Sequence, residues 1–446
     1  MKTLGTIRCT VVTAAALCLT ASAVAATDTY TLTDLGLFRP LGINNFGQLA
    51  GTILTTDADG EHLQAAFWTP SSANTTNGTL ITMNARRLSK INDVGQMIGD
   101  YGDGTNPGTA FLWTPNSPHG TTGTKVDLSG SISYSFGVSC LNNSGQVAYS
   151  TLDLTTLAFT TYLWTPTTPN GTTGTATNLG NFFAQGMNDY GQICCWTYGP
   201  SYNAFLWTPT TANASNGSLV SLGSLSDAHT APLDINSMGQ VVGVSEASNS
   251  VQSAFLWNPT APHSTSGTMI NLALGSPNVT SASGVDESGT AYGGQLVGLT
   301  VHAEMFKNGQ IIDLNSFFPA GSAFQLEGAI DGNEKGQIIG VMAINGEKHG
   351  FLLTPKSTQQ EIVDIKKLVQ NLVDIGALLP ANGQSLFAKL NSALAKVASG
   401  DKAGAVSDLK SFINQVTTFV KTGRLTTAQG QPLIDAANTI IGQLSS

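Results

Sequence analysis

Apolar residues occur in short runs along most of this chain, and polar turns separate the runs. The clearest run covers residues 110–115, Ala-Phe-Leu-Trp-Thr-Pro, and near copies begin at Ala204 and Ala254. Runs of about 4–8 apolar, aromatic or β-branched residues bounded by Gly, Asn and Pro are typical of β-strands. Because the runs return with a period of about fifty residues, we predict a repeated β-rich unit.

Two sequence features mark the units. The first is a turn that ends in Gly-Gln, at Gly47-Gln48, Gly95-Gln96, Gly145-Gln146, Gly191-Gln192, Gly239-Gln240 and Gly336-Gln337, with Gly289-Thr290 in the sixth place. The second is the large residue near the end of the apolar run, at Trp68, Trp113, Trp164, Trp207, Trp257, Phe306 and Leu353. Because both features give seven positions, we predict seven copies of the unit.

Each unit contains four strand-like pieces, as the fifth unit shows. Its pieces are residues 233–236, 240–244, 253–257 and 269–272. Pro259 ends the third piece, because proline cannot donate to a strand ladder. Four short strands in a repeat of about 40–50 residues are typical of a propeller blade, so the mainly β fold class is a seven-bladed β-propeller.

The fourth strand is missing from the last unit and present before the first. No copy follows the seventh third strand, which ends at Pro355, but residues 30–36 resemble one. We therefore predict that the N-terminal strand closes the last blade, because such closure leaves no exposed sheet edge. An open solenoid is the structural alternative.

The pattern becomes helical after Pro355. Residues 356–360 are polar and are interpreted as a linker, and residues 361–446 carry apolar positions three or four apart. Pro380 and Gly383 are expected to end the first helix, and Asp401 to cap the third. Thr426 with Gln429 forms a capping box for the fourth. This segment is predicted to be a small antiparallel four-helix bundle.

Residues 1–26 have the pattern of a secretory signal peptide. Lys2 and Arg8 precede an apolar run at 11–19, and small residues follow at 21–25. A membrane anchor is the alternative, but the run is too short to span a bilayer. We therefore expect a secreted, extracellular protein whose propeller covers residues 27–355, with the periplasm and the cell surface left open.

Composition narrows the class of partner. Only 11% of the residues are charged and the net charge is −9, without a basic cluster, which argues against a nucleic-acid partner. No later segment is apolar enough to span a membrane. Outside the signal, Cys140, Cys194 and Cys195 allow at most one disulfide, and we interpret them as small buried residues, with a Cys140 bridge as the alternative.

Candidate chemistry in the sequence is sparse. Asp57, Asp59, Asp100 and Asp103 lie in acidic, glycine-rich loops between strands, and such oxygens are weak candidates for calcium ligands. The histidines are scattered, and the sequence has no Gly-x-Ser-x-Gly elbow and no phosphate- or dinucleotide-binding glycine motif. No catalytic residue and no organic cofactor is predicted. The tryptophans of the repeat lie beside Phe and Leu, so we interpret them as core between blades rather than as sugar-stacking residues.

The units resemble an extracellular repeat family named for the tripeptide His-Ala-Phe (HAF). The motif is present as His302-Ala303 and as His349-Gly350-Phe351, and the resemblance covers residues 28–355. It implies a secreted β-propeller-like protein without an assigned chemistry. The sixth unit departs most from the pattern at 286–289, and the seventh is expected to carry a longer turn at 331–336.

The C-terminal segment resembles the FIMAH-type domain of secreted bacterial proteins. The similarity lies at residues 409–416, 423–426 and 433–437. It implies an accessory helical module and assigns no reaction.

Two functions are compatible with the sequence. The first is a secreted, non-catalytic repeat scaffold that binds an extracellular glycan or protein. The alternative is a polysaccharide-acting enzyme, a glycoside hydrolase or lyase, with acids from several blades in the channel. Two or three converging carboxylates with an Arg or Lys would favour the enzyme, and a uniformly Thr- and Asn-lined channel would favour the scaffold.

Overall fold

The computed structural model describes residues 30–57, 60–101, 109–128, 140–153, 158–197, 202–226, 229–246 and 251–445. The chain divides between Ser357 and Thr358 into a β unit and a helical unit. The helical unit begins earlier than the sequence predicted, because α1 (Thr358–Asp374) includes most of the expected linker at 356–360. Its polar residues 358–360 form the first turn of the helix rather than a separate connection.

The β unit consists of seven four-stranded antiparallel sheets, which we call blades 1 to 7. Blade 1 contains β2 (Phe38–Ile43), β3 (Leu49–Asp57), β4 (Gly60–Pro70) and β5 (Gly78–Thr82). Blade 2 contains β6 (Arg87–Ile91), β7 (Met97–Asp100), β8 (Ala110–Pro115) and β9 (Gly123–Asp127). Blade 3 contains β10 (Cys140–Leu141), β11 (Val147–Asp153), β12 (Ala158–Pro166) and β13 (Gly174–Gly180).

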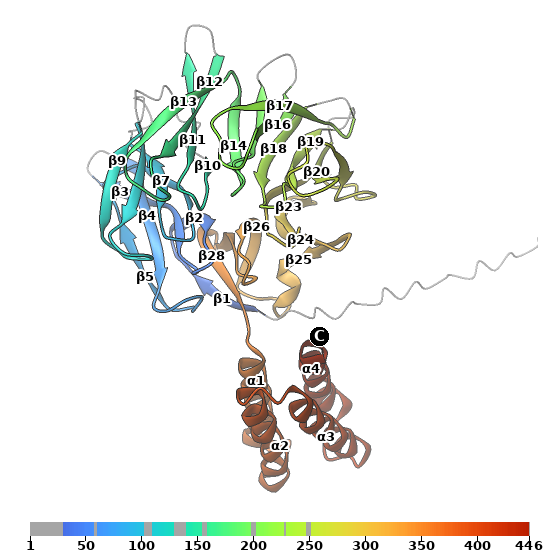
Figure 1. The fold of residues 1–446 in the computed structure, drawn as a ribbon. Helices are drawn as coiled ribbons and strands as arrows, with labels where there is room; N and C mark the ends of the chain where they lie inside the picture. Colours follow the sequence, from blue (N-terminus) through green and yellow to red (C-terminus); the bar gives the residue numbers. More distant parts are fainter. Residues whose placement is uncertain are drawn as a thin grey trace, which may run out of the picture. The chain divides into compact units, whose positions relative to one another are not determined.

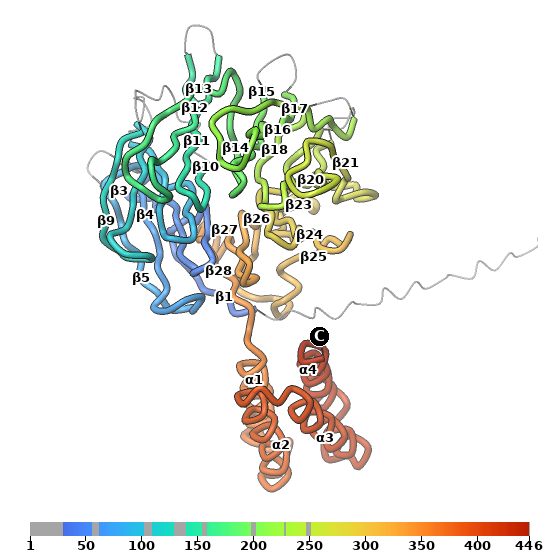
Figure 2. The backbone as a smooth tube through the Cα atoms, in the orientation of Figure 1, coloured from blue at the N-terminus to red at the C-terminus, as the bar shows by residue number. Residues whose placement is uncertain are grey.

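The remaining blades follow the same order. Blade 4 contains β14 (Phe183–Met187), β15 (Ile193–Thr197), β16 (Asn203–Pro209) and β17 (Gly217–Gly223). Blade 5 contains β18 (Thr230–Ile235), β19 (Val241–Glu246), β20 (Gln252–Pro259) and β21 (Gly267–Asn271). Blade 6 contains β22 (Thr280–Val285), β23 (Ala291–Val297), β24 (Thr300–Lys307) and β25 (Gln310–Asp313), followed by the 3-10 turn η1 (Leu314–Phe317). The blades succeed one another round a ring (Figures 1 and 2), and the predicted seven-bladed propeller is confirmed.

Blade 7 is built from both ends of the β unit. It contains β26 (Phe324–Gly332), β27 (Ile338–Ile344), β28 (Glu347–Pro355) and, outermost, β1 (Tyr30–Asp34). The antiparallel register places Tyr30 opposite Pro355 and Asp34 opposite Phe351. Figure 1 shows blue β1 beside orange β28.

The repeated Ala-Phe-Leu-Trp phrase is the third strand of a blade and joins that blade to both neighbours. In β8, Phe111 and Trp113 belong to the core shared with blade 1, and the Trp113 ring lies 5.5 Å from that of Phe67. Leu112 belongs instead to the core shared with blade 3. This two-sided burial follows from the alternation of side chains along a strand.

The repeated tryptophans are core residues, as the sequence indicated. Trp68, Trp113, Trp164, Trp207 and Trp257 are only 2–6% exposed. A glycine begins the fourth strand beside each of them: a Cβ on Gly123 would lie 2.6 Å from the Trp113 ring. The ring occupies the space that a side chain at this glycine would need.

Two turns differ from the sequence expectation. The turn of blade 7 is not longer than the others, because Asn333 takes the asparagine position and its N–H bonds the carbonyl of Gln337 at 3.0 Å. The turn of blade 6 keeps the same backbone, with the Asp286 N–H donating to the carbonyl of Thr290 at 3.0 Å. An aspartate therefore replaces asparagine here without rebuilding the loop.

The helical unit consists of α1, α2 (Pro380–Ala398), α3 (Lys402–Lys421) and α4 (Thr427–Ser445) around one apolar core. Pro380 and Gly383 do not end the first helix: α1 stops at Asp374, and Pro380 opens α2, where its missing N–H costs nothing. The predicted Asp401 cap is confirmed by its bond from the Gly404 N–H. The capping box of Thr426 and Gln429 is also present.

Two further features concern cysteines and membranes. Among the described residues, Cys140, Cys194 and Cys195 are buried and form no disulfide. Cys194 and Cys195 belong to different blade interfaces, so their side chains point to opposite faces of β15. Among the described residues, no helix is both long and apolar enough to cross a bilayer.

Candidate functional site: the central channel

A pocket of about 190 Å³ lies at the end of the ring where the first strand of each blade turns into the second. All seven blades contribute to its wall. Each gives the last residue of its first strand and residues of the Asn-x-x-Gly turn, so the repeat itself builds the pocket. We call this end of the ring the turn face.

The outermost layer, here called the rim, is acidic. It consists of Asn45, Asp93, Asn143, Asp189, Ser237, Glu287 and Glu334. Amides alternate with acids along part of it: the Asn143 Nδ2 donates to Asp93 Oδ2 at 3.0 Å and to Asp189 Oδ2 at 2.9 Å. The residues that line the pocket include no Lys, Arg or His. The rim carboxylates of Asp93, Asp189 and Glu287 are therefore stabilised by hydrogen bonds from neutral groups rather than by cations.

Glu287 has the most perturbed carboxyl of the rim. Burial raises its pKa, while hydrogen bonds from the N–H and hydroxyl of Ser237 lower it. The neighbouring charges of Asp189 and Glu334 raise it further.

A ring of side-chain amides lies one residue below the rim. It consists of Asn44, Asn92, Asn142, Asn188, Asn236 and Asn333. Each Nδ2 reaches the backbone carbonyl of the equivalent residue in the next blade, as Asn44 does with Asn92 at 2.9 Å. Asn333 returns to the carbonyl of Asn44 at 3.0 Å. These asparagines build their turns, as the sequence indicated, and also link the blades.

The amide ring is interrupted at blade 6. The side chain of Asp286 has no N–H to donate to the next blade, and its Oδ1 instead accepts the Thr290 N–H at 2.9 Å. Its Oδ2 accepts the Tyr292 hydroxyl at 2.8 Å. Burial, followed by the charge of Asp286, raises the pKa of Tyr292 far above its usual range, so the phenol remains a donor.

Below the amide ring comes a collar formed by the last residues of the first strands. Its members are Ile43, Ile91, Leu141, Met187, Ile235, Val285 and Gly332. The collar separates the polar mouth from a charged layer one residue deeper.

That layer brings Lys90, Asp234 and Asp331 together across the channel from blades 2, 5 and 7. Lys90 Nζ lies 3.5 Å from Asp234 Oδ1 and 3.5 Å from Asp331 Oδ2. The other oxygens accept backbone N–H groups: Asp234 Oδ2 from Val285 at 3.2 Å, and Asp331 Oδ1 from Gly332 at 2.9 Å. Every carboxylate oxygen of this charged triad thus has a partner.

Electrostatics keep the triad charged. Burial alone would lower the pKa of Lys90, but the two carboxylates raise it above its usual range, so the ammonium persists. Burial raises the pKa of Asp331 to about 6, although Lys90 opposes that shift. The side chains of Lys90, Asp234 and Asp331 are 25%, 12% and 11% exposed, which leaves them in limited contact with the channel.

The sequence contains a signal for this triad that lies outside the known catalytic motifs. The three residues stand two positions before the asparagine of their turns, where three other blades have Gly42, Gly186 and Gly284. A Cβ on Gly42 would lie 3.2 Å from the Lys90 Cα, so small residues leave room for the neighbouring strand. Charged residues at a position otherwise occupied by small residues would have indicated the cluster.

Of the predicted calcium ligands, only Asp100 has a side chain that the structure describes. Asp100 is bound by Arg86 at 2.7 Å and by Arg87 at 3.2 Å. Asp59 and Asp103 lie outside the described residues, and Asp57 is the last residue of β3. Among the residues with a described placement, no three His, Cys, Asp or Glu side chains form a group suited to a metal ion.

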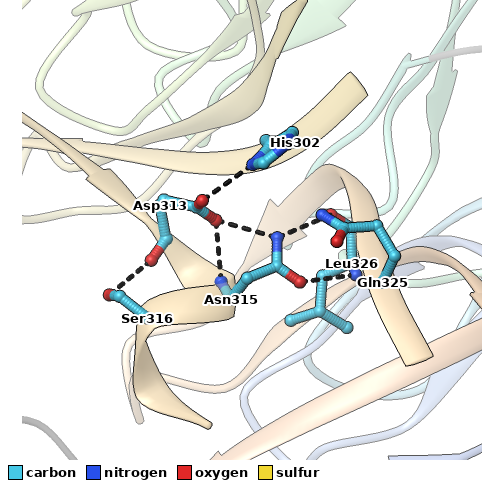
Figure 3. Close-up of polar contacts among 6 residues, drawn as sticks. All are labelled: His302, Asp313, Asn315, Ser316, Gln325 and Leu326. Carbon is cyan, nitrogen blue, oxygen red and sulfur yellow. Dashed lines mark hydrogen bonds and ion pairs between the residues drawn. The ribbon is translucent and has the colours of Figure 1, made fainter. Parts of the chain in front are cut away.

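The two histidines of the repeat motif each bond an aspartate of the neighbouring strand. His302 Nδ1 lies 2.8 Å from Asp313 Oδ2, and Asp313 Oδ1 accepts both the backbone and side-chain N–H groups of Asn315 (Figure 3). Asn315 Nδ2 then donates to the carbonyl of Leu326 at 2.9 Å, which ties blade 6 to blade 7. These histidines are structural linkers of strands.

Comparisons with known proteins find only low similarity. No protein-family model matches the chain, and no curated protein matches it. The propeller domain of the trilobed protease from Pyrococcus furiosus is similar, at 8% identity over 73% of this chain and 96% of that one, with a TM-score of 0.49. TolB from Acinetobacter baumannii gives 10% identity over 70% of this chain and 80% of that one, with a TM-score of 0.37. Trypanosoma rangeli sialidase gives 9% over 76% of this chain and 58% of that one, with a TM-score of 0.33. At these values the likenesses carry no argument about activity.

Proposed function

We propose that this chain is a secreted, non-catalytic propeller of the HAF-repeat type with a FIMAH-like helical module, and that it binds an extracellular glycan or protein. The observation that carries the proposal is the hydrogen bonding of the channel. The rim carboxylates of Asp93, Asp189 and Glu287 accept hydrogen bonds from the adjacent blade. Carboxylates that already accept such hydrogen bonds are better suited to holding the blades together and to binding a partner than to transferring a proton.

A second candidate, a polysaccharide-acting enzyme, has one specific observation in its favour: two carboxylates converge on a lysine in the channel, which is the arrangement expected of the enzyme. Asp234 Oδ1 and Asp331 Oδ2 both lie 3.5 Å from Lys90 Nζ, so these oxygens are at most about 7 Å apart. Paired carboxylates of glycosidases lie about 5–10 Å apart. The pKa of about 6 at Asp331 suits a general acid.

One experiment separates the two functions. The purified mature chain is incubated with a panel of polysaccharides and extracellular proteins, and binding and product release are measured on the same samples. The scaffold predicts binding without new reducing ends or unsaturated products. Release of products by the wild type, abolished in a folded Asp331→Asn variant, would replace the scaffold with the enzyme.

A further inference from the structure

An aromatic cluster lies at the ends of blades 3 and 4, opposite the turn face. Its members come from the starts of β12 and β14, the end of β15 and the residues just before β16 and β18: Phe159, Phe183, Trp196, Tyr202 and His229. Strands of a blade run antiparallel, so these ends are gathered on the face away from the pocket. We call this group the aromatic cluster.

Trp196 forms the centre of the aromatic cluster. Its ring centroid lies 5.4 Å from that of Phe159 and 5.1 Å from that of Phe183. Tyr202 stands edge-on to it at 5.0 Å with an interplanar angle of 86°. Edge-to-face contacts of this kind fix ring orientation. Tyr202 is therefore a supported side chain although it is 40% exposed.

The repeat does not account for Trp196 and Tyr202. The five tryptophans of the third strands fill the contacts between blades, whereas Trp196 lies in the second strand of blade 4. The equivalent position in blade 5 is Val244, and in blade 1 it is Thr52. A large aromatic pair that the core does not require, placed at the surface, is a feature of recognition sites.

A polar group with a defined direction lies against the exposed ring. The Tyr202 N–H donates to His229 Nδ1 at 3.0 Å, so the neutral imidazole carries its proton on Nε2. The backbone holds this pair in place, because the Thr230 N–H bonds the carbonyl of Tyr202 at 2.9 Å and the Glu246 N–H bonds that of His229 at 2.7 Å. The cluster thus combines a rigid aromatic surface with one oriented N–H donor.

We propose that Tyr202, supported by Trp196, stacks against a pyranose ring of an extracellular glycan, and that His229 Nε2–H donates to a hydroxyl of the same sugar. A sugar ring has an apolar C–H face and polar edges, which matches an aromatic surface bordered by a single donor. Among the described residues, the cluster includes no Lys, Arg, Asp or Glu, so an uncharged sugar fits it better than an ionic one. This inference rests on the glycan-binding form of the proposed function and assigns the binding to this face rather than to the pocket.

The test measures binding of the full mature chain to a panel of neutral polysaccharides and their oligosaccharides. Tryptophan fluorescence is recorded in the same titrations. Tyr202→Ala should weaken the affinity at least about tenfold, while Tyr202→Phe, which keeps the ring, should retain most of it. Leu299→Ala, a fully exposed apolar residue of the β23–β24 hairpin, is the matched control and should bind like wild type. Sugar should also change the fluorescence of the wild type, and Trp196→Phe should remove that change.

Three results would overturn the inference, and they differ in what they say about the scaffold. Glycan binding that Tyr202→Ala leaves intact and Asp189→Asn abolishes would place the site at the rim and keep the scaffold. Binding of an extracellular protein in place of any glycan, through the same cluster, would keep the scaffold and reject the sugar. If the chain binds none of the polysaccharides and none of the extracellular proteins tested, the inference and the proposed function are both rejected.

Discussion

Glu304 stands in the third strand of blade 6, where blade 2 has Phe111 and blade 7 has Phe351. It is 2% exposed, and within the described chain its Oε2 has no hydrogen-bond partner. Burial, and secondarily the charge of Asp313, raises its pKa to about 8. The carboxyl is therefore neutral in the folded protein at neutral pH.

The raised pKa of Glu304 gives stability a definite pH dependence. Between 4.5, its ordinary pKa, and about 8, the unfolded chain releases the proton and the folded chain retains it. The free energy of unfolding must therefore fall as pH rises through this window. We expect the Tm of wild type to fall between about pH 5 and pH 8 more steeply than that of Glu304→Gln, measured by calorimetry. Glu347→Gln, at an exposed position, should follow wild type, and parallel curves for wild type and Glu304→Gln would contradict this account.

Lys90 is the counter-ion of two buried acids, so its removal should be costly. Lys90→Met leaves Asp234 and Asp331 facing each other, and breaking a buried pair in this way costs about 3–5 kcal/mol of unfolding free energy. Because the two carboxylates repel each other once the ammonium is gone, the destabilisation should be largest above pH 7 and shrink in acid, where protonation relieves the repulsion. Denaturant unfolding at several pH values measures it.

The control for that variant is Lys348→Met. Lys348 pairs with Glu327 at the surface, where an ion pair contributes less than about 1 kcal/mol. Adding Asp331→Asn to Lys90→Met should recover part of the loss. An equal, small effect of both lysine substitutions would show that the triad contributes no more than a surface pair.

At the residue scale, the sequence predicts contacts between residues that are close in the chain, but not contacts between residues that are far apart in it. The burial of Trp113 could be read from its neighbours Phe111 and Leu112, because alternation along one strand is local. The triad could not, because its contacts join residues 144 and 241 positions apart. Closing a ring of blades creates those contacts, and no local pattern encodes them. The aromatic cluster could not be predicted for a related reason, since Trp196 is outside the repeated phrase.

At the scale of elements, the helical unit contains its own repeat. The α1–α2 and α3–α4 hairpins match residue by residue: Gly376 with Gly423, Leu378 with Leu425, and Gly383 with Gly430. Gly376 and Gly423 both have φ of 71°, which explains why each hairpin turns at a glycine. The same repeat explains why Pro380 does not end the first helix, although the sequence predicted that it would. Pro380 corresponds to Thr427, the first residue of α4, and it likewise begins the second helix of its hairpin.

The matched glycines make a clear prediction about packing. A Cβ on Gly430 would lie 2.4 Å from Val420 Cγ2, whereas nothing lies within 4 Å of a Cβ on Gly442 in the same helix. Gly430→Ala should therefore lower the melting temperature of the helical signal in circular dichroism. Gly442→Ala should raise the melting temperature, because alanine is about 0.5–1 kcal/mol more favourable than glycine inside a helix. If both substitutions stabilise equally, the close approach of α3 and α4 at Gly430 is wrong.

At the scale of the whole molecule, several bonds join the two ends of the β unit. The amide ring closes from Asn333 to Asn44, and β1 completes the sheet of β28. His349 Nδ1 lies 2.8 Å from Asp34 Oδ1, which adds a side-chain link between the same two strands. Tyr30 also enters the core shared by blades 6 and 7. The ring therefore depends on residues at both ends of the chain that forms it.

Removal of β1 tests this dependence directly. A chain that starts at residue 38 lacks β1, exposes the edge of β28 and uncovers the contacts of Tyr30 and Leu32, each contributing about 1.5–3 kcal/mol when fully buried. The matched control starts at residue 28 and keeps β1. We expect the control to melt like the full chain, and the shorter chain to melt at a clearly lower temperature and to associate through its free strand edge, as measured by calorimetry and light scattering. Because both truncations keep every asparagine that links the blades, equal melting temperatures would mean that the blade-to-blade amides, and not the N-terminal strand, hold the propeller closed.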